Sequence, residues 1–224
     1  MKEATPHGSI IYKILIVILS VALVATIIYP HTLWKQEAKR TKQCRDNMEH
    51  ILYAELTYNS ESGTGTYNDT LSKVINFIID DSTGRRVQTF TKYDSILTED
   101  IFKHLRQYDA AAAIIDTLLE YGRRYDIDTT EIRILDSLRT FPQYARQMDS
   151  IAIDVLDNMT TCPTVNKPYR IEVVDTSVIK VINIYCPLNA DDSLAVTRDF
   201  KLSKLGGLRI TNHGSIENME KVFK

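Results

Sequence analysis

The sequence predicts an α+β protein with a long N-terminal helix, a helical middle region and a C-terminal antiparallel β-sheet. Residues 14–29 form an apolar run of sixteen residues without a charge, and apolar residues then recur at helical spacing as far as Leu56. From Tyr169 onward apolar and polar residues alternate, which is typical of strands that bury one face. Helices that precede a run of strands, without alternating with them, indicate the α+β class.

The apolar run is long enough to cross a membrane. Residues 10–12 extend it to about twenty residues, the length that a helix needs to span a bilayer core about 30 Å thick. Lys13 is the one charge in the extended run, and it lies within a turn of the polar end, where its ammonium can reach the headgroups. The bulky residues that follow Pro30 differ from the small residues of a secretory cleavage site. We therefore expect a retained transmembrane helix over residues 9–30, after a tail of residues 1–8.

The charges that flank this helix bear on its orientation. The short N-terminal tail carries Lys2 and Lys13 against Glu3, whereas residues 35–46 carry five basic and two acidic side chains. Because basic residues favour the cytoplasmic side, this count places the large domain in the cytoplasm.

The soluble part begins with a helical stalk and continues as a mainly helical region. No strong breaker follows Pro30 until Gly63, so we expect one helix over residues 10–59, of which residues 31–60 form the stalk. Residues 61–160 form the mainly helical region, in which 84–93 is expected to be a strand pair or a loop. Helices are expected at 70–79, 98–125, 129–138 and 142–158.

Residues 161–224 are expected to form the antiparallel β region. Alternation at 169–174 and 179–185, with turn residues between, predicts one hairpin. A second hairpin is expected from 199–205 and 208–211, around Gly206-Gly207.

This layout resembles type IV pilins and the pseudopilins of type II secretion. If Gly8 stands for the glycine before prepilin cleavage, Ser9 starts the mature helix, and Pro30 falls twenty-one residues later, at the family's usual helical proline. The segment CRDNMEHILYAELTYNSESGTGTYNDTLSKV is similar to the post-membrane part of these proteins, and CPTVNKPYRIEV, IYCP and NHGSIEN are similar to their C-terminal sheet. The resemblance covers residues 8–80 and 160–217, with the middle region as an insertion.

The resemblance implies a non-catalytic, membrane-anchored component of a bacterial envelope or secretion assembly. It implies a place in the inner (cytoplasmic) membrane, with the soluble domain periplasmic or extracellular. The partners would be the lipid bilayer and other membrane or envelope proteins, contacted through the stalk and through helix packing around Lys13 and Pro30. The alternative is a single-pass accessory subunit of another membrane complex, of the respiratory or divisome type.

One position departs from the family pattern. Pilins carry Glu at the fifth position of the mature chain, where this sequence has Lys13. The family's Glu neutralises a neighbour's amino terminus, whereas Lys13 would place a second cation there. We therefore expect that the chain is not a processed, self-polymerising major pilin.

Composition and motifs point away from catalysis and nucleic-acid binding. The chain has 25% charged and 44% hydrophobic residues with a net charge of −2. This composition is typical of a folded domain, and it lacks the excess of basic residues that nucleic-acid-binding proteins show. The sequence contains no P-loop, GxSxG or HExxH motif. We expect no enzyme activity, no cofactor and no metal.

The cysteines leave three alternatives. Cys162 and Cys186 each precede a proline at the ends of the first hairpin, and a disulfide between them would enclose about 24 residues and contribute roughly 3 kcal/mol. With His213 they could instead bind zinc, but a fourth ligand is missing and no CxxC motif occurs. The third alternative is two unlinked buried thiols. Cys44 is expected to be a small apolar residue of the stalk.

Overall fold

The computed structural model describes residues 7–176, 179–199 and 210–223, and it confirms the α+β class. The chain forms two compact units, which are described separately. One contains residues 1–42 and 188–212, and the other contains residues 43–187 and 213–224.

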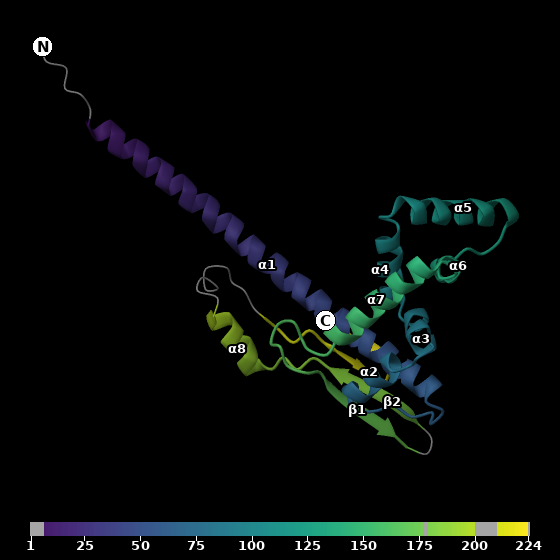
Figure 1. Cartoon of the computed structure of the whole chain (residues 1–224). Helices are drawn as coiled ribbons and strands as arrows, with labels where there is room; N and C mark the ends of the chain where they lie inside the picture. Colours follow the sequence, from purple (N-terminus) through teal and green to yellow (C-terminus); the bar gives the residue numbers. More distant parts are fainter. Residues whose placement is uncertain (1–6, 177–178, 200–209, 224) are drawn as a thin grey trace, which may run out of the picture. The chain divides into compact units, whose positions relative to one another are not determined.

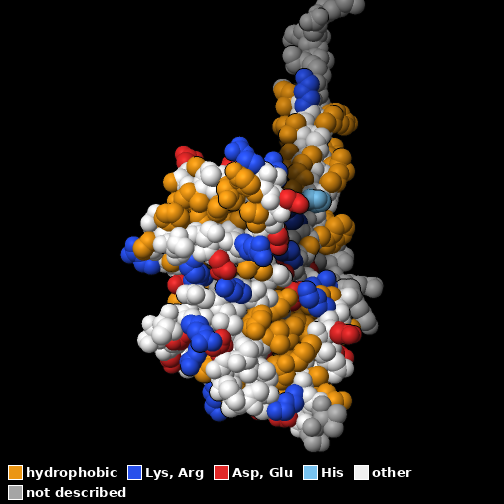
Figure 2. All heavy atoms as spheres, turned by 90° about the vertical axis from the view of Figure 1, so that its right-hand side faces the viewer, with side chains coloured by type: hydrophobic (Ala, Val, Ile, Leu, Met, Phe, Trp, Pro, Cys, Tyr) orange, Lys and Arg blue, Asp and Glu red, His pale blue; other side chains and the backbone are white. Residues whose placement is uncertain are grey.

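The first unit contains most of the apolar part of helix α1 (His7–Glu61) and the short helix α8 (Ala190–Asp199). α1 continues through Pro30, as one uninterrupted helix. Ile10, Tyr12 and the large apolar side chains from Ile14 to Ile28 are exposed, and Figure 2 shows hydrophobic side chains along this helix. Among the described residues, α1 is the one helix that is long and apolar enough to cross a membrane.

The second hairpin expected at 199–211 falls largely outside the described residues. Its first residue, Asp199, is the last residue of α8, and residues 210–211 carry no strand. The side chain of Asn189 accepts the backbone N–H of Asp192 at 2.8 Å, so a turn-forming residue begins a helix where the sequence indicated no helix.

In the second unit, the C-terminal part of α1 is the central helix. Residues 47–52 are buried one after another, which requires that the helix be covered on both sides. In Figure 1 the sheet lies along one side of this part of α1, and α3, α4, α6 and α7 lie along the other. The helices after α1 are α2 (Leu71–Ile79), α3 (Arg85–Tyr93), α4 (Ser95–Leu105), α5 (Asp109–Tyr125), α6 (Glu131–Leu138) and α7 (Pro142–Asn158).

Two expectations for the helical region were wrong. Residues 84–93 are neither a strand pair nor a loop: they form α3, whose buried Val87, Phe90 and Thr91 share one helical face. The single helix expected over 98–125 is two helices, α4 and α5, separated by residues 106–108. Tyr108, between the two helices, has an extended backbone conformation (φ −97°, ψ 119°), which interrupts the helical path.

The sheet has four antiparallel strands in sequence order: β1 (Arg170–Asp175), β2 (Lys180–Tyr185), β3 (Ser215–Glu217) and β4 (Glu220–Val222). The β1–β2 hairpin agrees with the sequence, with Arg170 opposite Tyr185. The β3–β4 hairpin was not expected. Its two turn residues, Asn218 and Met219, both have positive φ, as a type I′ turn requires, and a methionine gives no sequence signal for this.

Candidate metal centre

Four buried side chains from separate segments converge in the second unit. One comes from α1, one from the loop before β1, one from the residue after β2 and one from just before β3. Their sulfur and ring nitrogen atoms all lie within 4.8 Å of one another. We call them the thiol–imidazole cluster: Cys44, Cys162, Cys186 and His213.

The distances within the cluster are short. The sulfur of Cys44 lies 3.6 Å from the sulfur of Cys186, and the sulfur of Cys162 lies 4.0 Å from Nδ1 of His213. Solvent reaches none of them appreciably, since the most exposed, Cys186, is 6% exposed. The structure has all three cysteines as thiols, and a Cys162–Cys186 disulfide stays a prediction.

Local backbone structure fixes Cys162. Its N–H donates to the carbonyl of Lys167 at 2.9 Å, and its carbonyl accepts the N–H of Asn166 at 2.8 Å. Asn166 adopts a positive φ of 53°, which asparagine tolerates better than most residues. The loop therefore folds back on itself and turns the thiol inward.

The other side of the cluster is held by Gly214. Its carbonyl accepts the N–H of Cys186 at 3.3 Å, so the residue after β2 is held next to the start of β3. Gly214 has φ 114°, and a Cβ there would lie 2.7 Å from the carbonyl oxygen of Val222. A glycine is required at this position, directly after His213.

Hydrogen bonds within the cluster act in opposite directions on two thiols. The side chain of Cys186, and after it that of Cys44, lowers the pKa of Cys162 by hydrogen bonding. The bond to Cys162 is the first cause of the raised pKa of Cys44, followed by the bond to Cys186 and by burial. These bonds favour a thiolate at Cys162 and a protonated thiol at Cys44. Such a cluster can hold a soft cation, or two of its sulfurs can be oxidised to a disulfide.

Sequence reasoning named three members of the cluster and missed the fourth. Cys162, Cys186 and His213 do lie together. Cys44 is 142 residues before Cys186, in a helix that the sequence predicted to be a stalk. No spacing motif connects them. Lys13 and Pro30 belong to the part of α1 in the other unit.

The buried polar side chains of α1 include His50 and Glu55. Nδ1 of His50 forms a short hydrogen bond with Oδ2 of Asp94, and Oδ1 of Asp94 accepts the N–H of Leu97 at 2.9 Å, which caps α4. Glu55 is completely buried, and burial is the main cause that raises its pKa from 4.5 to about 7.

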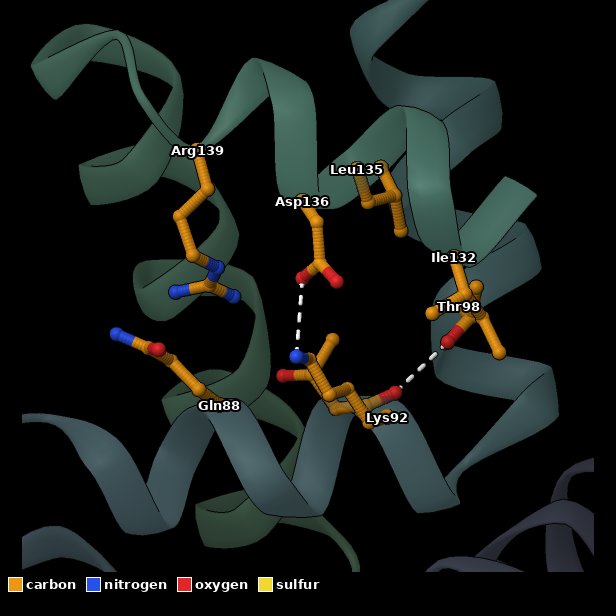
Figure 3. A pocket seen from close by; sticks show the side chains of 8 residues that line it. Gln88, Lys92, Thr98, Ile132, Leu135, Asp136 and Arg139 are labelled. Carbon is orange, nitrogen blue, oxygen red and sulfur yellow. Dashed lines mark hydrogen bonds and ion pairs between the residues drawn. The ribbon is translucent and has the colours of Figure 1, made fainter. Parts of the chain in front are cut away.

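The cavities of the helical region offer no comparable site among the described residues. The hollow in Figure 3 lies between α3, α4 and α6, and it encloses about 10 Å³, room for one water molecule at most. Lys92 and Asp136 form an ion pair of 3.2 Å across it, and Thr98 donates to the carbonyl of Thr91 at 2.7 Å. These polar groups satisfy one another.

Comparison with known proteins gives no relative. No family model, no curated protein and no solved structure matches the chain.

Proposed function

We propose that this protein is a membrane-anchored, non-catalytic, pilin- or pseudopilin-like component of a bacterial envelope or secretion assembly. The observation that carries the proposal is the division of α1. The helix exposes an apolar surface over residues 10–28, and the same helix becomes the buried core of a domain from Cys44 onward. A helix that is apolar and exposed over the length of a bilayer core fits an anchor.

Exposed apolar side chains support a role in protein–protein contacts. Of the residues of α5, only Ala111, Ile115 and Gly122 are buried. Tyr121 and Tyr125 are more than half exposed, with their rings 4.5 Å apart. Aromatic residues on a poorly covered helix are typical of interaction surfaces.

The anchor has a direct test. Membranes from cells that express the full chain are washed at alkaline pH, which removes peripheral proteins. We expect the full chain to remain in the membrane fraction, and a truncated chain that begins at residue 35 to appear in the soluble fraction. Release of the full chain by the wash would refute the anchor.

The proposed orientation places the soluble domain outside the cytoplasm. Labelling of the native cysteines cannot test it, because all three are buried. Ser150 is exposed on α7, so a Ser150→Cys variant gives an accessible thiol. We expect a membrane-impermeant maleimide to label this variant in intact cells. Labelling only after lysis would place the domain in the cytoplasm, as the basic residues after Pro30 favour.

The identity of the partner proteins distinguishes this proposal from the alternative, an accessory subunit of another membrane complex. Crosslinking in native membranes, followed by purification and mass spectrometry, should recover the platform and ATPase proteins of a secretion or pilus system. A Tyr121→Ser, Tyr125→Ser variant should recover less of them if α5 is the contact. Recovery of respiratory or divisome proteins would favour the alternative.

A further inference from the structure

We propose that the thiol–imidazole cluster binds one structural Zn²⁺ ion. The proposal does not depend on the membrane anchor or on the pilin-like assembly, because all four ligands belong to the second unit. It supplies the fourth ligand that the sequence lacked, since Cys44 joins the set from α1.

The geometry is close to that of a tetrahedral zinc site. With Zn–S near 2.3 Å and Zn–N near 2.0–2.1 Å, the ligand atoms of a regular tetrahedron lie about 3.5–3.8 Å apart. The separation of the Cys44 and Cys186 sulfurs, 3.6 Å, is within this range, and that from Cys162 to His213, 4.0 Å, is slightly above it. No pair exceeds 4.8 Å, so movements of less than about 1 Å would close the shell.

The donor set selects the metal. Three thiolates and one imidazole are soft and borderline ligands in a tetrahedral arrangement, which suits zinc far better than calcium, magnesium or manganese. Atoms that all lie within 4.8 Å of one another can surround a single ion, whereas an iron–sulfur cluster needs room for several atoms. All four positions of the shell are protein ligands, and a closed shell indicates a structural role.

Groups around the ligands fit a bound cation with three thiolates. The hydroxyl of Tyr169 lies 3.4 Å from the sulfur of Cys44 and 3.3 Å from the carbonyl oxygen of the same residue. Nε of Arg45 donates to the carbonyl of His213 at 2.9 Å, which brings a positive charge to a site whose net charge would be −1. Donors of this kind orient ligands and stabilise thiolate charge.

The ion would join the core helix to the sheet. Cys44 lies on α1, whereas the other three ligands lie on the segments that lead into or out of β1, β2 and β3. Because a preformed site rarely exists in an unfolded chain, the free energy of zinc binding would contribute directly to folding.

The first measurement is the metal content of the full chain. The protein is expressed in zinc-supplemented medium, purified in detergent with a reductant and without a metal-charged column, and analysed by elemental mass spectrometry. We expect about one zinc per chain, and a chelator should lower the midpoint of thermal unfolding until zinc is returned. A chain that stays zinc-poor after this preparation, with its cysteines reduced and zinc supplied, would overturn the proposal.

Cobalt substitution identifies the ligands. The Co²⁺ form should show the strong visible bands of tetrahedral cobalt and near-ultraviolet bands from thiolate ligands. A His213→Cys variant should still bind one ion, and its thiolate bands should rise by about one third, as four thiolates replace three. A His104→Cys variant is the matched control, since His104 lies on α4, outside the cluster, and its spectrum should not change. Equal spectra for both variants and the parent chain would exclude His213 as a ligand.

The hydroxyl of Tyr169 gives a test that leaves all four ligands in place. A Tyr169→Phe variant should weaken zinc binding by about 10–100-fold in a competition titration. Tyr144→Phe changes a buried tyrosine on α7 and should leave the affinity unchanged. Loss of zinc affinity in both variants would mean a general effect on folding and would remove Tyr169 from the site.

Discussion

Replacement of Glu55 by glutamine should stabilise the protein at alkaline pH and have little effect at acid pH. Glu55 is fully buried in α1, and its Oε2 accepts the N–H of Asn68 at 3.0 Å. Its Oε1 is buried without a hydrogen-bond partner in the described part of the chain. Burial raises the pKa of this carboxyl to about 7, the hydrogen bond from Asn68 opposes the rise, and the charge of Asp69 adds to it.

The direction and the size of the effect of Glu55→Gln on stability follow from the pKa values of Glu55 in the unfolded and folded states. A carboxyl whose pKa is raised on folding binds its proton more tightly in the folded state. The protonated carboxyl of Glu55 therefore contributes its full stability below the unfolded pKa of 4.5. This contribution is lost as the pH rises through the folded pKa of about 7. The shift of roughly 2.5 units corresponds to about 3 kcal/mol at pH 8, because one unit is worth 1.36 kcal/mol.

Thermal unfolding followed by circular dichroism measures the difference. At pH 8 the Glu55→Gln variant should unfold about 5–10 °C above the parent chain, and at pH 5 the two should agree within about 2 °C. Glu120→Gln, on the exposed face of α5, is the matched control and should change neither value. If the Glu55→Gln and parent midpoints differ by the same amount at both pH values, the argument from burial is wrong.

Three further substitutions test other parts of the structure. Asp94→Ala leaves His50 buried without its partner and removes the cap of α4, so chemical denaturation should show a loss of about 3–5 kcal/mol. Gly214→Ala places a Cβ against the carbonyl of Val222, and we expect a loss of at least about 1–3 kcal/mol together with a lower zinc content. Lys13→Leu removes a charge from the apolar helix, so crosslinking in detergent should show more self-association than in the parent chain.

The sequence predicted best where one period continues over many residues. The long helix, the β1–β2 hairpin and α7 follow from apolar spacings that tertiary contacts do not override. The prediction failed at α3 because RRVQTFTKY contains β-branched and aromatic residues, which favour strands in isolation. There the side chain of Asp81 accepts the N–H of Arg86 at 3.0 Å and so supports the first turn of the helix.

The candidate site was only partly visible in the sequence. A proline after Cys162 and another after Cys186 marked the ends of a hairpin, and this placed the two thiols close together. The place of Cys44 depends on which face of α1 packs against the sheet. The spacing of Cys44, Met48 and Ile51 puts Cys44 on the apolar face of the helix, but it does not show which segments pack against that face.

The number of thiols in the cluster favours a metal over a disulfide and bears on the orientation of the protein. A Cys162–Cys186 disulfide would use two sulfurs and leave that of Cys44, now 3.6 Å from Cys186, in a position to attack the bond. A zinc ion uses all three sulfurs together with His213 and leaves no thiol over. A Cys162–Cys186 disulfide would indicate an oxidising compartment, whereas a zinc site gives no such indication. The outward orientation would then rest on the pilin-like layout alone, against the basic residues that follow Pro30. The metal analysis and the labelling of Ser150→Cys are therefore read together. If zinc is found and Ser150→Cys is labelled only after lysis, an accessory subunit is favoured over a pilin-like component.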